Sequence, residues 1–150
     1  MLLRALLAFL ALPGVVAIAI PGWLTARAVQ RGADSHVIAL LPLLAGFALL
    51  LWCVRDFYVA GKGTLAPWEP PRNLVTVGLY RYSRNPMYVA VATMLIGWSA
   101  FTGSSTLAIY TCFVIAAFHL RVLLHEEPFL ARTHGDAWKE YRARVPRWLL

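Results

Sequence analysis

The stretch GLYRYSRNPMY, from Gly78 to Tyr88, places aromatic side chains, two arginines and an Asn-Pro pair between two apolar segments. A second polar stretch, His125-Glu126-Glu127, ends another apolar run, and Glu126 lies 38 residues beyond Tyr88. Ionisable residues within or against a bilayer are costly and mark functional sites. Function is therefore expected where these two stretches lie.

The composition indicates a membrane protein. Of the 150 residues, 60% are hydrophobic and 14% are charged, and the mean hydropathy is +0.64. Soluble globular domains are about 25% charged, and a soluble chain of this length could not bury so much apolar surface. By length the chain forms one domain, residues 1–150.

Two charge-free runs predict two spanning helices within residues 1–58. Ala5–Leu24 contains 20 residues without a charge and Val37–Val54 contains 18, and about 20 apolar residues span the hydrocarbon core. Thr25–Ser35 is expected to be a polar connection between them. The second run ends at Arg55-Asp56, where the arginine is expected to reach the head groups and an ion pair between the two is possible in principle.

The first apolar run also allows a different interpretation. Ala17-Ile18-Ala19 has the small-x-small form of a signal-peptide cleavage site. The run continues to Trp23, however, and this length favours a spanning helix.

An interfacial loop is expected from Val59 to Asn73. Prolines exclude a continuous helix there, and they are Pro67, Pro70 and Pro71. Gly61-Lys62-Gly63-Thr64 lacks the spacer of a phosphate-binding loop, so that function is excluded.

A helical hairpin is expected after the first polar stretch. Tyr88–Phe101 and Leu107–Leu120 each hold 14 apolar-leaning residues around the uncharged turn Thr102–Ser105. Extended at their inner ends, these segments can cross the membrane and bring Tyr88 and Glu126 to the same end. The polar, basic tail is predicted to form two short helices separated by Gly135, the second of them ended by a proline.

The distribution of basic residues predicts the orientation. The middle loop and the tail hold most of them: Arg55, Lys62, Arg72, Arg81, Arg84, Arg121, Arg132, Lys139, Arg142, Arg144 and Arg147. The hairpin turn holds none, and the first connection holds Arg27 and Arg31. The positive-inside rule then predicts four spans with both termini and both polar stretches in the cytoplasm, although the first connection counts against it.

Three other classes of site are excluded by pattern. The net charge of +7 flanks apolar segments, which fits anionic lipids rather than nucleic acid. Cys53 and Cys112 lie in apolar runs and are expected to be buried free thiols. His119 and His125 near the glutamates do not have metal-ligand spacing, so no metal site is expected.

Asn85-Pro86 is typical of a helix start, with Asn85 as the N-cap and Pro86 in the first turn. The plain interpretation is a capped membrane helix, and the functional one is a ligand at the free N–H groups. Tyr80, Tyr82 and Tyr88 are explained equally by an interfacial aromatic belt or, for Tyr80 and Tyr88, by stacking on a base or a sulfonium.

Glu126 and Glu127 end the returning apolar run, and a solvated carboxylate pair is the default interpretation. Acids are disfavoured at a helix C-terminus, so the pair is expected to need a positive partner, either an arginine or a cationic ligand. On an α-helix, His119 shares a face with Glu126, and Arg121 shares another with His125.

The pattern from Gly78 through R-N-P-x-Y, followed by Glu126-Glu127 and then by a Gly135-initiated W-x-x-Y-x-x-x-V-P segment, resembles the isoprenylcysteine carboxyl methyltransferase and phospholipid methyltransferase family. These are integral membrane enzymes, and the resemblance covers roughly residues 62–150. It implies an all-α polytopic membrane fold of about four transmembrane helices, with a cytoplasmic cofactor-binding loop and C-terminal helices. Residues 59–150 would form the cofactor-binding and catalytic part.

The resemblance also implies site residues. The methyl donor S-adenosylmethionine, with S-adenosylhomocysteine as product, would be bound by Arg72, Asn73, Leu74, Val75, Thr76, Val77, Gly78, Leu79, Tyr80, Asn85, Pro86, Met87, Tyr88 and Glu126. Glu126 and Arg121 would be the catalytic residues, Glu126 mainly holding the cofactor and Arg121 orienting an anionic acceptor, although strict alignment puts Val122 at the position of the family's substrate-binding arginine. Asn85 replaces a histidine of the better-known eukaryotic members.

The implied activity is methyl transfer to a lipophilic small-molecule or lipidated acceptor, such as an isoprenylcysteine carboxylate or a phospholipid, at the membrane–cytoplasm interface. The acceptor is expected to enter from the surrounding membrane lipids; in a bacterium the membrane would be the inner one. Two alternatives are a membrane reductase of the steroid-reductase type, which would bind NADPH, and a non-catalytic membrane partner with the same fold.

Overall fold

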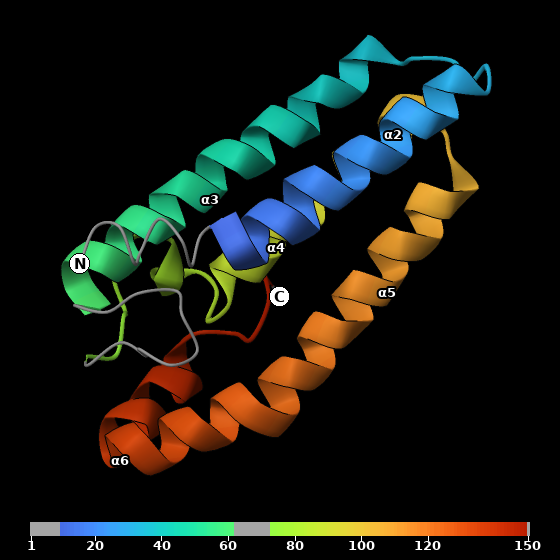
Figure 1. Ribbon diagram of the computed structural model, residues 1–150. Coiled ribbons are helices and arrows are strands. Elements are labelled where there is room, and N and C mark those ends of the chain that lie inside the picture. Colours follow the sequence, from blue (N-terminus) through green and yellow to red (C-terminus); the bar gives the residue numbers. More distant parts are fainter. Residues whose placement is uncertain (1–9, 62–72, 150) are drawn as a thin grey trace.

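The computed structural model of the chain describes residues 10–61 and 73–149, and within these ranges all regular structure is helical. The all-α prediction is therefore confirmed for the part of the chain that the structure describes (Figure 1). The elements, in chain order, are η1 (Leu10–Ala19), α2 (Ile20–Gln30), η2 (Val37–Ala39), α3 (Leu40–Gly61), η3 (Gly78–Arg81), α4 (Pro86–Thr102), α5 (Ser105–Arg121), η4 (Val122–Glu126) and α6 (Glu127–Arg144).

Two continuous helical runs in the described residues are long and apolar enough to cross a membrane. They are Val37–Gly61, of 25 residues, and Ser105–Arg144, of 40 residues, while α4 is a shorter apolar helix. Because a span needs about 20 residues, the apolar helix α5 accounts for the second run, and the charged helix α6 lies beyond the spanning segment. The prediction of four spans is not tested further by these lengths.

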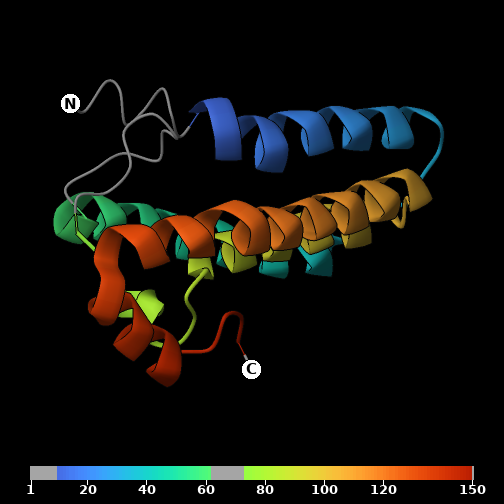
Figure 2. The ribbon, with the colours of Figure 1, turned by 90° about the horizontal axis from the view of Figure 1, so that it is seen from below.

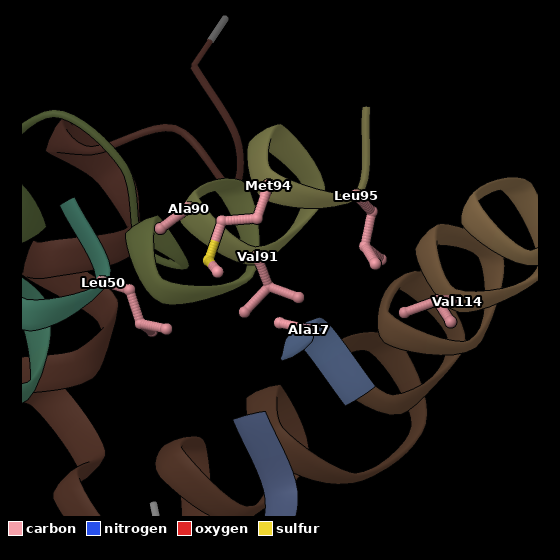
Figure 3. Packing of buried hydrophobic residues seen from close by; sticks show 7 residues of the cluster. All are labelled: Ala17, Leu50, Ala90, Val91, Met94, Leu95 and Val114. Atoms are coloured by element: carbon pink, nitrogen blue, oxygen red, sulfur yellow. The ribbon is translucent and has the colours of Figure 1, made fainter. Parts of the chain in front are cut away.

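Helix α4 is the centre of the bundle. The main buried cluster gathers Ala17 from η1, Leu50 from α3 and Val114 from α5 around four side chains of α4, as Figure 3 shows. Those four are Ala90, Val91, Met94 and Leu95. A helix that is apolar on all sides is expected to be surrounded by other helices, and α4 satisfies this expectation.

Glycines let α3 and α4 approach closely. A Cβ atom on Gly46 of α3 would lie 2.7 Å from the carbonyl oxygen of Ala90, and one on Gly97 of α4 would lie 2.7 Å from the backbone nitrogen of Leu43. Such distances are well inside van der Waals contact, so only glycine allows this packing. The pair α3–α4 is thus the rigid part of the scaffold.

The N-terminal helix is attached through two backbone carbonyl groups in the turn before Pro21. A proline has no N–H, so it withholds one helical hydrogen bond from that turn. Trp98 donates instead to the carbonyl oxygen of Ala17 at 3.0 Å, and the Tyr110 hydroxyl donates to that of Val16 at 2.9 Å. These two bonds fix η1 against α4 and α5.

Several boundaries differ from the sequence-based expectations. The predicted connection Thr25–Ser35 is wrong in its first half, because α2 continues to Gln30; alanine, arginine and glutamine there favour helix. Helix α3 continues past Val54 to Gly61. The proline-containing segment and the Gly-Lys-Gly-Thr stretch beyond Gly61 fall almost wholly outside the described residues.

The hairpin and the tail agree with prediction. Helices α4 and α5 are joined at Gly103, whose φ of 59° is the left-handed conformation that ends α4. Gly135 interrupts α6 with φ 50°, as expected for two helical pieces. Figure 2 shows α6 turning away from the line of α5.

Of the two free cysteines, Cys53 is buried as predicted, but Cys112 is exposed on α5, so the prediction is wrong there.

Candidate functional site

The two polar stretches meet at one end of the bundle, where α3 ends, α4 begins and α5 passes into α6 (Figure 1). The Tyr88 hydroxyl, in the first turn of α4, donates a short hydrogen bond to the Glu126 carboxylate. The next acid along the chain, Glu127, lies 3.0 Å from the guanidinium group of Arg84. The predicted meeting of these stretches is confirmed.

The Glu126 carboxylate is the centre of the candidate site. Its Oε1 atom accepts hydrogen bonds from Tyr88 and from Nε of Arg121, the latter at 2.9 Å. Glu126 is 31% exposed and Arg121 is 50% exposed, so both remain open to a ligand. The ring of Tyr88 packs on Phe118 with centroids 4.5 Å apart.

A π-helical turn brings Arg121 to Glu126. On an ordinary α-helix, residues three or four apart are neighbours, whereas the wider π turn aligns residues five apart. The segment η4, Val122–Glu126, is such a turn, and Arg121 contacts Glu126 across five residues. The α-helical spacing assumed from the sequence was therefore wrong here. Val122, the aligned alternative to Arg121, is fully buried.

The helix-end argument for the glutamate pair is also wrong. Glu126 ends η4, but the helical backbone continues directly into α6 at Glu127. Neither carboxylate therefore lies at a free C-terminus. The positive partners that this argument required are nevertheless present, and they are arginines from three parts of the chain.

Glu127 has a different set of partners from Glu126. Arg147 binds it through both Nε, at 2.7 Å, and Nη2, at 3.0 Å, and Arg84 approaches at 3.0 Å. Glu127 is only 12% exposed. Burial alone would raise the pKa of Glu127, but the hydrogen bonds from Arg147 and the charges of Arg84 and Arg147 outweigh it and leave the pKa below its ordinary value.

The C-terminal tail is bound to the loop before α4 by three hydrogen bonds. Arg84 N–H donates to the carbonyl of Pro146 at 2.9 Å, and Asn85 Nδ2 and Ser83 Oγ donate to the carbonyl of Arg147 at 3.0 and 3.3 Å. Asn85 precedes α4 as predicted, with Pro86 in the first turn, but its side chain does not cap that helix. Its amide instead supports the tail.

The loop predicted to bind the methyl donor, called the donor loop below, is described over residues 73–79 and lies between α3 and α6. Asn73 donates to the carbonyls of Ala60 and Gly61, each at 3.3 Å, and Leu74 packs against Trp138 and Tyr141 of α6. Of the remaining predicted residues, Val75 is buried, Thr76 and Val77 are exposed, and Gly78, Leu79, Pro86 and Met87 are partly or fully buried. Arg72 lies outside the described residues.

Tyr80 is a core residue in this structure. Its ring is 6% exposed and clusters with Cys53 and Val75, and its carbonyl accepts a hydrogen bond from the Tyr141 hydroxyl at 2.7 Å. Burial raises the pKa of the Tyr80 hydroxyl well above its ordinary value. Tyr82, by contrast, is 70% exposed, which suits a residue at the membrane surface.

Two features of this end were missed by sequence reasoning. Arg147 was considered only as one of the basic residues of the tail, although it directly follows the Val145-Pro146 pair that ends the family pattern. Asp56 was considered only as a partner of Arg55, and the two side chains do lie 3.5 Å apart. Asp56 is nevertheless buried, and a single acid in an apolar run was the available signal.

A shallow, open pocket of about 270 Å³ lies along the end of α5 and η4, at the same helical junction. Its lining consists of two leucines, an arginine and a histidine: Leu120, Arg121, Leu124 and His125. Arg121 thus faces both the pocket and Glu126. Within the described ranges, no group of three or more histidine, cysteine or acidic side chains could hold a metal ion.

Apolar helices with a charged site at one end define a helical membrane protein. A family model described as phospholipid methyltransferase matches residues 35–137, which is more than half of the chain. The chain belongs to this family of membrane methyltransferases.

Three curated proteins are similar to parts of the chain. Protein-S-isoprenylcysteine O-methyltransferase of Schizosaccharomyces pombe is 32% identical over 73 residues, covering 49% of this chain and 31% of that protein. Nickel-cobalt-cadmium resistance protein NccN of Alcaligenes xylosoxydans xylosoxydans is 30% identical over 96 residues, covering 64% of this chain and 40% of that protein. An uncharacterized protein of Haemophilus influenzae is 27% identical over 63 residues, covering 42% of this chain and all of that protein.

The chain spans less than half of the length of the first two of these relatives. No solved structure is significantly similar to it.

Proposed function

We propose that this protein transfers a methyl group from S-adenosylmethionine to a lipophilic acceptor at the membrane–cytoplasm interface. The observation that carries the proposal is the contact of Tyr88, Arg121 and Glu126 in a member of a methyltransferase family. It joins a partly exposed carboxylate, a half-exposed cation and an aromatic pair at one point.

The residues at this point fit the methyl donor. S-adenosylmethionine supplies a methyl group on a sulfonium that is already activated for displacement, so the protein has mainly to align the reactants and exclude water. Glu126 offers a carboxylate to the positive charge of such a ligand, and the tilted rings of Tyr88 and Phe118 offer π faces beside it. The buried Tyr80 and the apolar cluster around it keep water from the inner side.

The pocket next to Arg121 supports an amphiphilic acceptor. Leu120 and Leu124 give it an apolar lining, and Arg121 and His125 give it hydrogen-bond donors, of which Arg121 also contacts Glu126. An anionic group, such as the carboxylate of a lipidated cysteine, would be oriented by Arg121. A carboxylate acceptor needs no general base, so Arg121 and Glu126 act by orientation, and Tyr88 holds Glu126 in place.

Calorimetric titration of the purified protein in detergent with S-adenosylhomocysteine tests the proposal. We expect saturable heat of binding with this product and none with NADPH. Glu126→Gln should weaken binding at least tenfold, because it removes the carboxylate charge while keeping the size of the side chain. Glu140→Gln, an exposed glutamate on α6, is the matched control and should leave the affinity unchanged.

The outcomes separate the three candidate functions. Binding of NADPH without binding of the nucleoside product would instead indicate a membrane reductase. Absence of binding for both ligands would indicate a non-catalytic membrane protein. Equal loss of affinity in Glu126→Gln and Glu140→Gln would contradict the role given to Glu126.

A further inference from the structure

Asp56 is a buried carboxylate that lacks a hydrogen-bond donor for one of its oxygens among the described residues. It lies on α3, within the apolar run Val37–Gly61, and is 7% exposed. Its Oδ2 atom is buried and has no hydrogen-bond partner among the described residues. An ionised carboxylate in such a place costs several kcal/mol unless it is paired.

Arg55 does not supply this missing hydrogen-bond donor. Its guanidinium lies 3.5 Å from Oδ1, the other carboxylate oxygen, and its side chain is 73% exposed. Pairs with such exposed partners contribute only about 0–1 kcal/mol. The Oδ2 atom therefore remains without a hydrogen-bond donor among the described residues.

The unused oxygen faces the predicted donor loop. Gly78, at the start of η3, has φ +56°, and a Cβ atom there would lie 1.9 Å from Asp56 Oδ2 and 3.3 Å from Trp52 Nε1. Any side chain at position 78 would collide with the carboxylate. The left-handed turn at a glycine thus brings the backbone of the loop directly against Asp56.

The surroundings of Asp56 belong to the same buried cluster as Tyr80. Phe57, the next residue on α3, packs against Tyr80 with ring centroids 6.3 Å apart, and Cys53 and Leu79 lie in the same cluster. Asp56 is therefore a carboxylate of α3 held against η3, the element that leads to the Tyr88–Glu126 contact.

We infer that Asp56 is a second carboxylate of the donor site and accepts hydrogen bonds from the α-ammonium group of S-adenosylmethionine. This inference rests on the proposed function and extends it to a residue on α3. Glu126, which also contacts Arg121 at the pocket, would share the positive charge of this ammonium group from the acceptor side. The N–H groups of the ammonium would supply the hydrogen-bond donor that the Oδ2 atom lacks.

Two ligands and one substitution test the inference. S-adenosylhomocysteine carries the α-ammonium, whereas 5′-methylthioadenosine keeps the nucleoside and the thioether but has no amino-acid part. Asp56→Asn should weaken binding of S-adenosylhomocysteine at least tenfold and binding of methylthioadenosine less than twofold. Asp136→Asn, on an exposed residue paired with Lys139 at 2.8 Å, is the matched control and should change neither.

The stability of the ligand-free protein provides a second readout. Because a buried carboxylate with one unsatisfied oxygen and only an exposed ion-pair partner is destabilising, Asp56→Asn should leave the thermal unfolding midpoint unchanged or raise it. A lowered midpoint, or equal loss of affinity for both ligands, would make Asp56 a structural residue and overturn the inference. Wild-type protein that binds neither nucleoside would overturn the proposed function; wild-type protein that binds S-adenosylhomocysteine no better than Asp56→Asn would overturn this inference alone.

Discussion

Glu126 and Glu127 are adjacent in sequence and have different partners in the structure. One step along a helix turns the side chain by about 100°, so Glu126 faces Tyr88 and Arg121 while Glu127 faces Arg84 and Arg147. The first carboxylate is partly open, and the second is held by two guanidinium groups. Glu127 therefore supports the structure, and Glu126 remains for a ligand.

Removing the charge of Glu127 should destabilise the fold rather than act on the ligand. In Glu127→Gln, Arg84 and Arg147 would lose the carboxylate that links the loop before α4 to the tail. Breaking a buried pair by removing one partner costs roughly 3–5 kcal/mol, less to the extent that Arg147 is solvated. The expected result is a clearly lowered thermal unfolding midpoint in detergent, with the affinity of the folded protein for S-adenosylhomocysteine little changed.

The effect of pH identifies charge as the cause. Because the pKa of Glu127 is lowered in the folded protein, its stabilisation is present above the unfolded pKa of about 4.3. It is lost as the pH falls through the folded pKa. The difference in midpoint between wild type and Glu127→Gln should therefore shrink below about pH 4, and a difference that persists undiminished into acid would contradict the assignment. Asp136→Asn, in the exposed pair with Lys139, should cost less than about 1 kcal/mol.

At the scale of elements, the site depends on departures from regular helix. The π turn η4 aligns Arg121 with Glu126, and the proline at the start of α4 places Tyr88 one turn from the loop. Wide turns of this kind are frequent at functional sites. They are held in place by regular neighbours, and the close packing of α3 on α4 is the main one.

The packing of α3 on α4 predicts opposite results for two glycine substitutions. Alanine favours helix over glycine by about 1 kcal/mol, and Gly22→Ala in α2 meets only the Trp98 ring at 4.0 Å, so it should be neutral or stabilising. In Gly97→Ala the new methyl would lie 2.7 Å from the backbone of Leu43, and the resulting overpacking costs about 1–3 kcal/mol.

Unfolding midpoints of the two variants, measured in the same detergent, check this. Gly97→Ala should be the less stable of the pair, and its helices α3 and α4 should move apart. Equal midpoints would show that α3 and α4 can move apart without loss of stability.

At the scale of the molecule, the sequence predicted the regular elements better than the site geometry. Hydrophobic run lengths and the Gly103 turn were enough to predict the α4–α5 hairpin and, from it, the meeting of Tyr88 with Glu126. The resemblance named both Arg121 and Glu126, but their direct contact across five residues could not be predicted from helical spacing, because a π turn has no clear mark in the sequence. Nor could the burial of Asp56 or the binding of Glu127 by Arg147, since both depend on segments distant in sequence packing together.

The position of basic residues makes a prediction for the whole molecule. Arg81 and Arg84 lie at the site end of the bundle, and the hairpin turn between α4 and α5 carries no basic residue. The positive-inside rule therefore predicts that the site end faces the cytoplasm, with Arg27 and Arg31 of the first connection counting against this orientation. That is also the compartment in which a soluble methyl donor is made and can reach Glu126.

Single-cysteine labelling in bacterial cells tests this orientation. In a background with Cys53→Ala and Cys112→Ala, Tyr82→Cys reports the site end, where Tyr82 is 70% exposed, and Ser105→Cys reports the exposed hairpin turn. A maleimide that cannot cross the inner membrane should label Ser105→Cys in spheroplasts and Tyr82→Cys only after the membrane is permeabilised. The cysteine-free background is the control and should not be labelled. Labelling of Tyr82→Cys before permeabilisation would place the candidate site on the side without the methyl donor, and the proposed reaction could not occur there.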